Sequence, residues 1–298
     1  MSRMTAFEEE TVELPNGESI VYRKRKGGTH KLILIHGNMN SSVNWDVLMT
    51  DLAADFTVYA LDLRGFGAST YNTPIEGIKD FSDDIKAWAD KMGFSKFSIA
   101  GWSMGGNVAM RFAIDYPDML EKMILMSSGS PKGYPLEKRK FFGLLKTGEY
   151  LKTKEEIANS VKMFENIRKK NKRKALRLIL NKGIYTHKKP LDGRMVKYEK
   201  AFMQQRNLVD VNYAMTYFNI AHENNGVTDG TGEVDSIKTP TLILHGTGDK
   251  VVSIEKAEET KSLLGDSAQL ETFDEAGHAL PVDKLPETSK AFEEFLLE

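Results

Sequence analysis

The segment Gly101-Trp102-Ser103-Met104-Gly105-Gly106 constrains the fold of this chain most strongly, because its serine lies between glycines two residues away on either side. A short apolar run over residues 97–100 precedes it and is typical of a buried strand. Residues 107–114 follow directly and have the composition of a helix. This context predicts that Ser103 lies on a sharp, strained turn with its hydroxyl exposed, and that a Cβ at either glycine would collide with neighbouring backbone. An ordinary glycine-rich turn remains the alternative on this motif alone.

A serine hydroxyl is a poor nucleophile at neutral pH, so a reactive Ser103 needs a histidine base and a carboxylate that orients the histidine. Asp249 lies in the loop after an apolar strand expected over residues 241–246. His278 lies in the loop after a strand expected over residues 268–273. We therefore predict Asp249 as the acid and His278 as the base.

Other residues compete for these roles but are less suitable by position. The remaining histidines are His30, His36, His187, His222 and His245. His36 and His245 each precede a glycine at a strand end, where packing against loop backbone is the favoured interpretation. Asp274 is near His278 in sequence, but it stands at a strand end where solvated carboxylates are common.

Two backbone N–H groups are candidates for stabilising an oxyanion, a contribution of about 3 kcal/mol per donor. The first is that of Asn38, in the polar loop after an apolar strand over residues 31–36. The second is that of Met104, the residue after Ser103. The same loop also suits a cap by Ser41 or Ser42 on a following helix, and both interpretations can hold together.

Four separated segments together resemble the α/β-hydrolase superfamily over nearly the whole chain. They are His36-Gly37-Asn38, residues 62–69 (DLRGFGAS), residues 101–106, and Gly248-Asp249 with Gly277-His278. The chain order Ser, Asp, His is also that of this family. The resemblance implies an α/β-hydrolase fold, with a mainly parallel central sheet flanked by helices, and an ion pair between Asp62 and Arg64. Many relatives have proline shortly after the His-Gly pair, where this chain has Met39.

Periodicity predicts a core of residues 1–130 and 239–298, interrupted by a helical cap over residues 131–238. Strands are expected near residues 10–14, 20–23, 32–36, 57–61, 97–101, 123–127, 242–245 and 269–273, the first two as an antiparallel hairpin. Core helices are expected near residues 81–91 and 287–297. Cap helices are expected near residues 137–146, 155–170, 173–180, 194–205 and 212–222. Apolar cap residues are candidates to line the pocket: Phe141, Phe142, Leu145, Met163, Phe164, Ile167, Met195, Phe202, Met203, Tyr213, Met215, Tyr217 and Phe218.

The formal net charge of -1 hides a division of sign. Residues 131–200 contain 21 Lys or Arg against 7 Asp or Glu, and residues 168–177 are the most basic part. A solvated helix face explains such a block, as does attraction of an acidic substrate, an acyl carrier protein or an anionic membrane. Nucleic acid is disfavoured because no recognised binding motif accompanies the charge.

Cysteine is absent, so neither a disulfide framework nor a cysteine-based metal site is expected, and the chemistry invokes no metal or cofactor. Residues 1–10 lack the apolar stretch of a signal peptide, and no run of about 18 uncharged apolar residues could span a bilayer. We therefore expect a cytoplasmic protein that is not transmembrane.

The sequence favours a serine hydrolase that acts on a small-molecule acyl ester, a lactone or a thioester through an acyl-enzyme on Ser103. Relatives with the same triad and a cap leave carbon–carbon bond hydrolysis and perhydrolysis open. The GWSMGG motif and the basic cap also resemble carboxylesterases that cleave a methyl ester from an acyl group on a carrier protein. A ligand-binding or signalling homologue without enzymatic activity is the remaining alternative.

Overall fold

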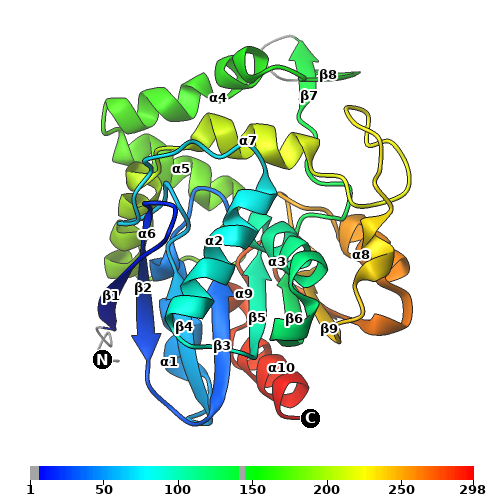
Figure 1. The fold of residues 1–298 in the computed structure, drawn as a ribbon. Coiled ribbons are helices and arrows are strands. Elements are labelled where there is room, and N and C mark those ends of the chain that lie inside the picture. The colour runs from blue at the N-terminus through cyan, green and yellow to red at the C-terminus, as the bar shows by residue number, and fades with distance from the viewer. Residues whose placement is uncertain (1–6, 141–144) are drawn as a thin grey trace.

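The computed structural model describes residues 7–140 and 145–298, and its centre is an eight-stranded sheet (Figure 1). In spatial order the strands are β1 (Glu8–Glu13), β2 (Ser19–Arg25), β4 (Phe56–Leu61), β3 (His30–Ile35), β5 (Phe97–Trp102), β6 (Leu120–Met126), β9 (Thr241–Gly246) and β10 (Ala268–Phe273). The pairs β1–β2 and β2–β4 are antiparallel, and all other neighbours are parallel. All eight predicted strands are present, and Gly17 adopts a φ of 83° in the turn of the predicted hairpin.

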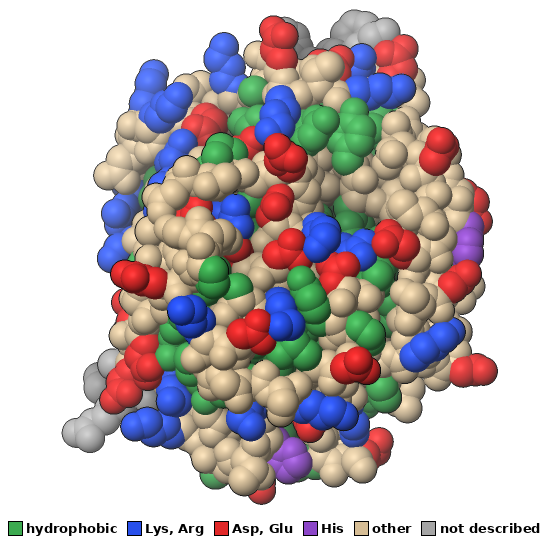
Figure 2. Space-filling view, viewed as in Figure 1, with side chains coloured by type: hydrophobic (Ala, Val, Ile, Leu, Met, Phe, Trp, Pro, Cys, Tyr) green, Lys and Arg blue, Asp and Glu red, His purple; other side chains and the backbone are tan. Residues whose placement is uncertain are grey.

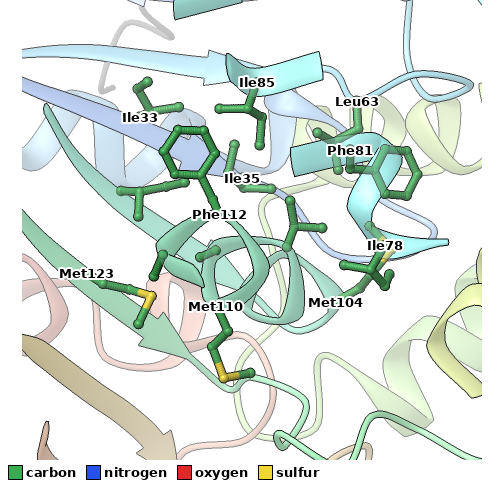
Figure 3. Packing of buried hydrophobic residues seen from close by; sticks show 14 of the residues in the cluster. Ile33, Ile35, Leu63, Ile78, Phe81, Ile85, Met104, Met110, Phe112 and Met123 are labelled. Carbon is green, nitrogen blue, oxygen red and sulfur yellow. The ribbon is translucent and has the colours of Figure 1, made fainter. Parts of the chain in front are cut away.

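Helices cover both faces of the sheet, because successive residues of its inner strands are apolar on both sides. In β3, Ile33 and Ile35 pack against the helices on one face of the sheet, whereas Leu32 and Leu34 pack against the helices on the opposite face. The first face carries α2 (Ile78–Lys91), α3 (Met104–Asp115) and α8 (Ile254–Leu264), and the second carries α1 (Asp46–Asp51), α9 (Leu280–Asp283) and α10 (Leu285–Leu297). Figure 3 shows Ile33 and Ile35 among apolar side chains of α2 and α3. This is the mainly parallel, helix-flanked sheet expected from the sequence.

The chain between β6 and β9 leaves the sheet, and we call residues 131–238 the inserted segment. It begins with the hairpin of β7 (Glu137–Lys140) and β8 (Leu145–Tyr150). Four helices follow: α4 (Lys154–Lys169), α5 (Arg173–Gly183), α6 (Asp192–Gln204) and α7 (Leu208–Tyr217). They lie above the end of the sheet at which the parallel strands finish (Figure 1). α4 starts where it does because Thr153 and Glu156 form a reciprocal capping box.

Two predicted cap helices are wrong in position or type. The helix predicted over residues 137–146 is replaced by β7 and β8, on either side of residues 141–144, which lie outside the described part of the chain. Glycines at positions 143 and 148 disfavour a helix here, and Gly148 adopts a φ of 74° within β8. The helix predicted over residues 212–222 instead runs from Leu208 to Tyr217.

Candidate active site

Ser103 lies on a strained turn between β5 and α3, as its motif predicts. Its backbone φ is 56°, a conformation rare for a residue with a side chain. Hydrogen bonds hold it there: the Ser103 N–H donates to the Met126 carbonyl at 3.0 Å, and the Gly106 N–H donates to the Ser103 carbonyl at 2.9 Å. A Cβ at Gly101 would collide with the carbonyl of Gly105, and a Cβ at Gly105 with that of Ile35 in β3. Both glycines are therefore needed for the close packing of strand and helix.

Asp249 and His278 meet at the ends of the last two strands. His278 Nδ1 lies 2.7 Å from Asp249 Oδ2. The other carboxylate oxygen accepts the N–H groups of Val251 at 2.7 Å and Val252 at 3.0 Å. Burial opposes ionisation of Asp249, but His278 and these two N–H groups outweigh it and hold the pKa of the carboxyl below its usual value. Asp249 is thus a fixed anion that orients the imidazole and leaves its Nε2 free of this pairing.

The competing acid and the packed histidines have other partners. Asp274 is exposed, and its Oδ1 accepts the Thr247 hydroxyl at 3.1 Å. His36 Nε2 accepts the Leu63 N–H at 3.1 Å, and its Nδ1 lies 2.8 Å from the Gly37 carbonyl. His245 Nε2 lies 2.9 Å from the Val252 carbonyl. Both rings are fully buried, and burial lowers the pKa of each histidine.

The remaining histidines lie on the surface of the molecule. They are His30, His187 and His222, all exposed. His222 lies in the loop after α7 with its Nε2 3.1 Å from Asp235 Oδ1.

The two candidate oxyanion donors belong to residues from different elements that line one cavity with Ser103. The N–H of Met104 is at the first position of α3, where an N–H has no acceptor within its own helix. Asn38 lies in the loop after β3, and its side-chain oxygen accepts the Met39 N–H at 3.0 Å. Met39 takes a φ of 64°. Ser41 caps the short 3-10 helix Ser42–Trp45, so the loop also has the capping role that the sequence suggested.

The predicted ion pair between Asp62 and Arg64 is wrong. Asp62 instead accepts the N–H groups of Ser42 at 2.7 Å and Ala68 at 2.9 Å. Arg64 turns toward α2, where its Nε lies 2.7 Å from Asp84 Oδ2 and its Nη2 lies 2.5 Å from Asp84 Oδ1. The loop folds closely around the Asp62 carboxylate, so two backbone N–H groups satisfy it. The Arg64 guanidinium therefore pairs with Asp84.

Ser103 and His278 line the same cavity, which has a volume of about 320 Å³. Asn38, Met39 and Met104 also line it, and its remaining wall is mostly apolar. The inserted segment contributes Phe164, Ile179, Leu180, Gly183, Ile184, Asn212 and Met215. The cavity therefore joins the strand-end loops to the helices above them.

A family model for the alpha/beta hydrolase fold matches residues 31–285. The chain belongs to the alpha/beta hydrolase family. A (lyso)-N-acylphosphatidylethanolamine lipase from Homo sapiens is 32% identical over 132 residues, which are 42% of this chain and 38% of the lipase. An uncharacterized protein from Mycobacterium tuberculosis is 32% identical over 103 residues, 35% of this chain and 30% of that protein. This chain thus spans between 30% and 38% of the length of these curated relatives.

Solved structures extend the likeness in fold to the whole hydrolase. An esterase from Exiguobacterium antarcticum superposes with a TM-score of 0.76 at 17% identity, covering 98% of this chain and 100% of the esterase. A thermophilic esterase from Thermogutta terrifontis gives a TM-score of 0.70 at 19% identity, covering 97% of this chain and 98% of the esterase. At these identities the likeness concerns the fold.

Sequence reasoning found part of the cavity wall of this alpha/beta hydrolase and missed the rest. Of the apolar residues predicted to line it, Phe164 and Met215 do so, whereas Phe141 and Phe142 lie outside the described residues. Ile179 and Leu180 were missed, although residues 173–183 form a strongly amphipathic helix whose apolar side could have indicated them.

A second, larger cleft of about 780 Å³ adjoins the cavity of this hydrolase and is more polar. Its lining includes Lys132, Asn224, Lys250, Lys256 and Glu259. Both spaces are bordered by Tyr134 and Val251, and the Tyr134 hydroxyl donates to the Val251 carbonyl at 3.0 Å.

Residues 7–140 and 145–298 of the hydrolase contain neither a candidate membrane span nor a candidate metal cluster. None of the helices there combines the length and apolar content needed to cross a bilayer. In the same ranges there is no group of three or more His, Cys, Asp or Glu side chains placed to hold a metal ion.

Proposed function

We propose that this protein is a serine hydrolase that cleaves a carboxylic ester, lactone or thioester through an acyl-enzyme on Ser103. One observation carries the proposal: Ser103 and His278 line one cavity while Asp249 holds the far side of the imidazole at 2.7 Å. A serine hydroxyl becomes a nucleophile when a histidine can take its proton and a carboxylate orients that histidine. Membership of the alpha/beta hydrolase family supports it, as does the esterase and lipase character of the proteins that this chain resembles.

The reaction follows from the roles of the three side chains. His278 Nε2 takes the proton of the Ser103 hydroxyl as the serine oxygen attacks the acyl carbon. Asp249 stays ionised and stabilises the imidazolium that forms. The protonated His278 then gives its proton to the leaving alcohol or thiol, and a water activated by the same histidine releases the acid.

The oxyanion and the acyl chain need separate binding groups. The N–H groups of Asn38 and Met104 are the proposed donors to the oxygen that becomes negative in the tetrahedral intermediate. The apolar wall of the 320 Å³ cavity suits the hydrocarbon part of the acyl group. We further propose that the inserted segment is the cap expected from the sequence, since its residues form much of this wall and would exclude water.

A fluorophosphonate probe tests the nucleophile directly. The probe should label Ser103 and abolish hydrolysis of p-nitrophenyl butyrate, because it phosphonylates a serine that a histidine has activated. Peptide mass spectrometry identifies the labelled residue. A burst of p-nitrophenol in the first turnover would show that an acyl-enzyme accumulates.

Two variants make this test specific. Ser103→Ala should lose labelling and activity yet remain folded, because the change removes one oxygen at a half-buried position. Ser253→Ala, an exposed serine in the adjoining polar cleft, should keep both. Labelling of a serine other than Ser103, or activity that survives in Ser103→Ala, contradicts the proposal.

A further inference from the structure

The side chain of Gln205, the residue after α6, is buried against the core loop that carries Asn38. Its Oε1 accepts the Met39 N–H at 3.1 Å. Its Nε2 donates to Asn38 Oδ1 at 2.8 Å and to Asn207 Oδ1 at 3.0 Å. One amide of the inserted segment thus uses its acceptor and both of its donors. Two of the three bonds go to Asn38 and Met39, whose loop we call the oxyanion loop.

The surrounding groups fix the orientation of this amide. The Met39 N–H can only donate, so it must face Oε1, and the side-chain oxygens of Asn38 and Asn207 then accept from Nε2. Asn207 is itself anchored to the core, because its Nδ2 donates to the Arg64 carbonyl at 2.7 Å. A flipped Gln205 amide would turn its NH₂ group toward the Met39 N–H and its oxygen toward two side-chain oxygens, which is energetically costly.

Met39 needs such support because its backbone is in an uncommon conformation. Its φ of 64° lies in the left-handed region, which a residue with a side chain occupies only where its surroundings hold it. The N–H of Asn38 lies in the adjoining Gly37–Asn38 peptide unit, so a shift of the Asn38–Met39 backbone moves it as well. A bond from Gln205 to each of these two residues therefore acts on the direction of that N–H.

We propose that Gln205 is a positioning residue that holds the Asn38–Met39 backbone so that the Asn38 N–H points at the developing oxyanion. The proposal rests on the proposed acyl transfer, in which this N–H is a donor. The inserted segment then contributes to the chemistry through an amide that touches the oxyanion loop and not the substrate.

The expected kinetic signature follows from when the oxyanion exists. A donor aimed at the oxyanion stabilises the transition state more than the bound substrate, so a misdirected donor lowers kcat with little change in KM. Removal of a whole donor lowers kcat by about 10²–10³-fold. Gln205→Met keeps the donor but releases its loop, so we expect a loss of roughly 10–100-fold, below that limit.

The experiment compares Gln205→Met with Gln204→Met, the same replacement at the preceding, half-buried glutamine. For each protein we would measure kcat and KM for p-nitrophenyl butyrate, the thermal unfolding midpoint, and the inhibition constant of an alkyl trifluoromethyl ketone. That ketone forms a tetrahedral adduct with Ser103, and the oxyanion of this adduct lies where the N–H groups of Asn38 and Met104 are proposed to donate. Hydrogen exchange of the Met39 amide reports on the loop without reference to activity.

The proposal expects three changes in Gln205→Met that are absent from Gln204→Met. The values of kcat and of ketone affinity fall by similar factors, KM stays within about twofold, and the Met39 amide exchanges faster. Three results would each overturn the proposal. They are a loss of kcat with unchanged ketone affinity, a loss of activity that only follows the fraction of unfolded protein, and an unchanged exchange rate of the Met39 amide. Absence of ester hydrolysis in the wild type contradicts the proposed function instead, and the Met39 exchange rates still decide whether Gln205 holds the loop.

Discussion

One ion pair of the core and one of the inserted segment hold their charged groups in contrasting ways. In the core, Arg64 and Asp84 form an ion pair whose side chains are 6% and 1% exposed. In the inserted segment, Lys154 pairs with Asp210 while 48% of the lysine side chain remains exposed. Figure 2 shows Lys and Arg side chains along the edge of the molecule that carries α4–α6, whereas both signs are interspersed over the rest of this face.

This difference indicates a division of work between the two regions. A buried charge is expensive unless it is paired and hydrogen-bonded, so each partner of a buried pair is held in a single geometry. Asp249 belongs to this class, with His278 and two N–H groups around it. Exposed charges are screened by water and salt, and they affect encounter with ligands more than they affect geometry. We therefore expect the charge-dependent part of the chemistry to rest on the buried Asp249–His278 pair of the core, and any response to anionic substrates to rest on the exposed charges of the inserted segment.

The largest effect should come from Asp249→Asn. An amide keeps the shape but favours the wrong tautomer of His278, a change that can lower kcat by about 10⁴-fold where the aspartate is the only orienting group. Steady-state hydrolysis of p-nitrophenyl butyrate measures this. Asp274→Asn is the matched control, because that carboxylate is exposed and bonded to Thr247. A larger loss in the control than in Asp249→Asn would show that the wrong acid has been assigned.

Asp84→Asn should have the next largest effect, on stability. It leaves the Arg64 guanidinium buried without a counter-charge, which lowers the free energy of unfolding by about 3 kcal/mol or more. Urea denaturation followed by circular dichroism gives the value. A loss no greater than that at an exposed pair would show that the two regions do not differ as their ion pairs indicate.

Charge reversal in the inserted segment should act selectively. With Lys169, Lys170, Lys172 and Arg173 changed to Glu, kcat/KM for neutral p-nitrophenyl acetate should stay within about twofold, because exposed charges barely affect encounter with a neutral ligand. For an acyl carrier protein, a CoA thioester or anionic vesicles, kcat/KM should fall severalfold at low salt. The wild-type rate should fall as salt rises, because screening acts over about 10 Å at 0.1 M. Equal kcat/KM values of the variant and the wild type on every anionic substrate would remove the carrier-protein and membrane alternatives. A solvated helix face would then be the remaining explanation of the basic block.

The smallest effect is expected from Lys154→Ala. Its pair with Asp210 is largely exposed on the lysine side, so its loss should change the free energy of unfolding by less than about 1 kcal/mol. The urea denaturation used for Asp84→Asn measures both variants on one scale. A change as large as that of Asp84→Asn would remove the contrast between the core and the inserted segment.

The features that the sequence alone determined depend on neighbours along the chain. Alternating and continuous apolar runs predicted all eight strands of the sheet, and glycine spacing predicted the strained turn at Ser103. Asp249 and His278 could be chosen because each follows a strand, and parallel strands finish at the same edge of a sheet. These signals are local, or follow from the direction of the strands.

Only the tertiary structure decided which distant side chains pair. Arg64 bonds Asp84 and not Asp62, because two backbone N–H groups had already satisfied the nearer acid. Gln205 reaches Asn38 across 167 positions of sequence, and no local pattern marks either residue as the other's partner. Such contacts depend on how the inserted segment packs on the core. Local sequence predicts elements and candidate groups, whereas packing selects the partners that hold those groups in place.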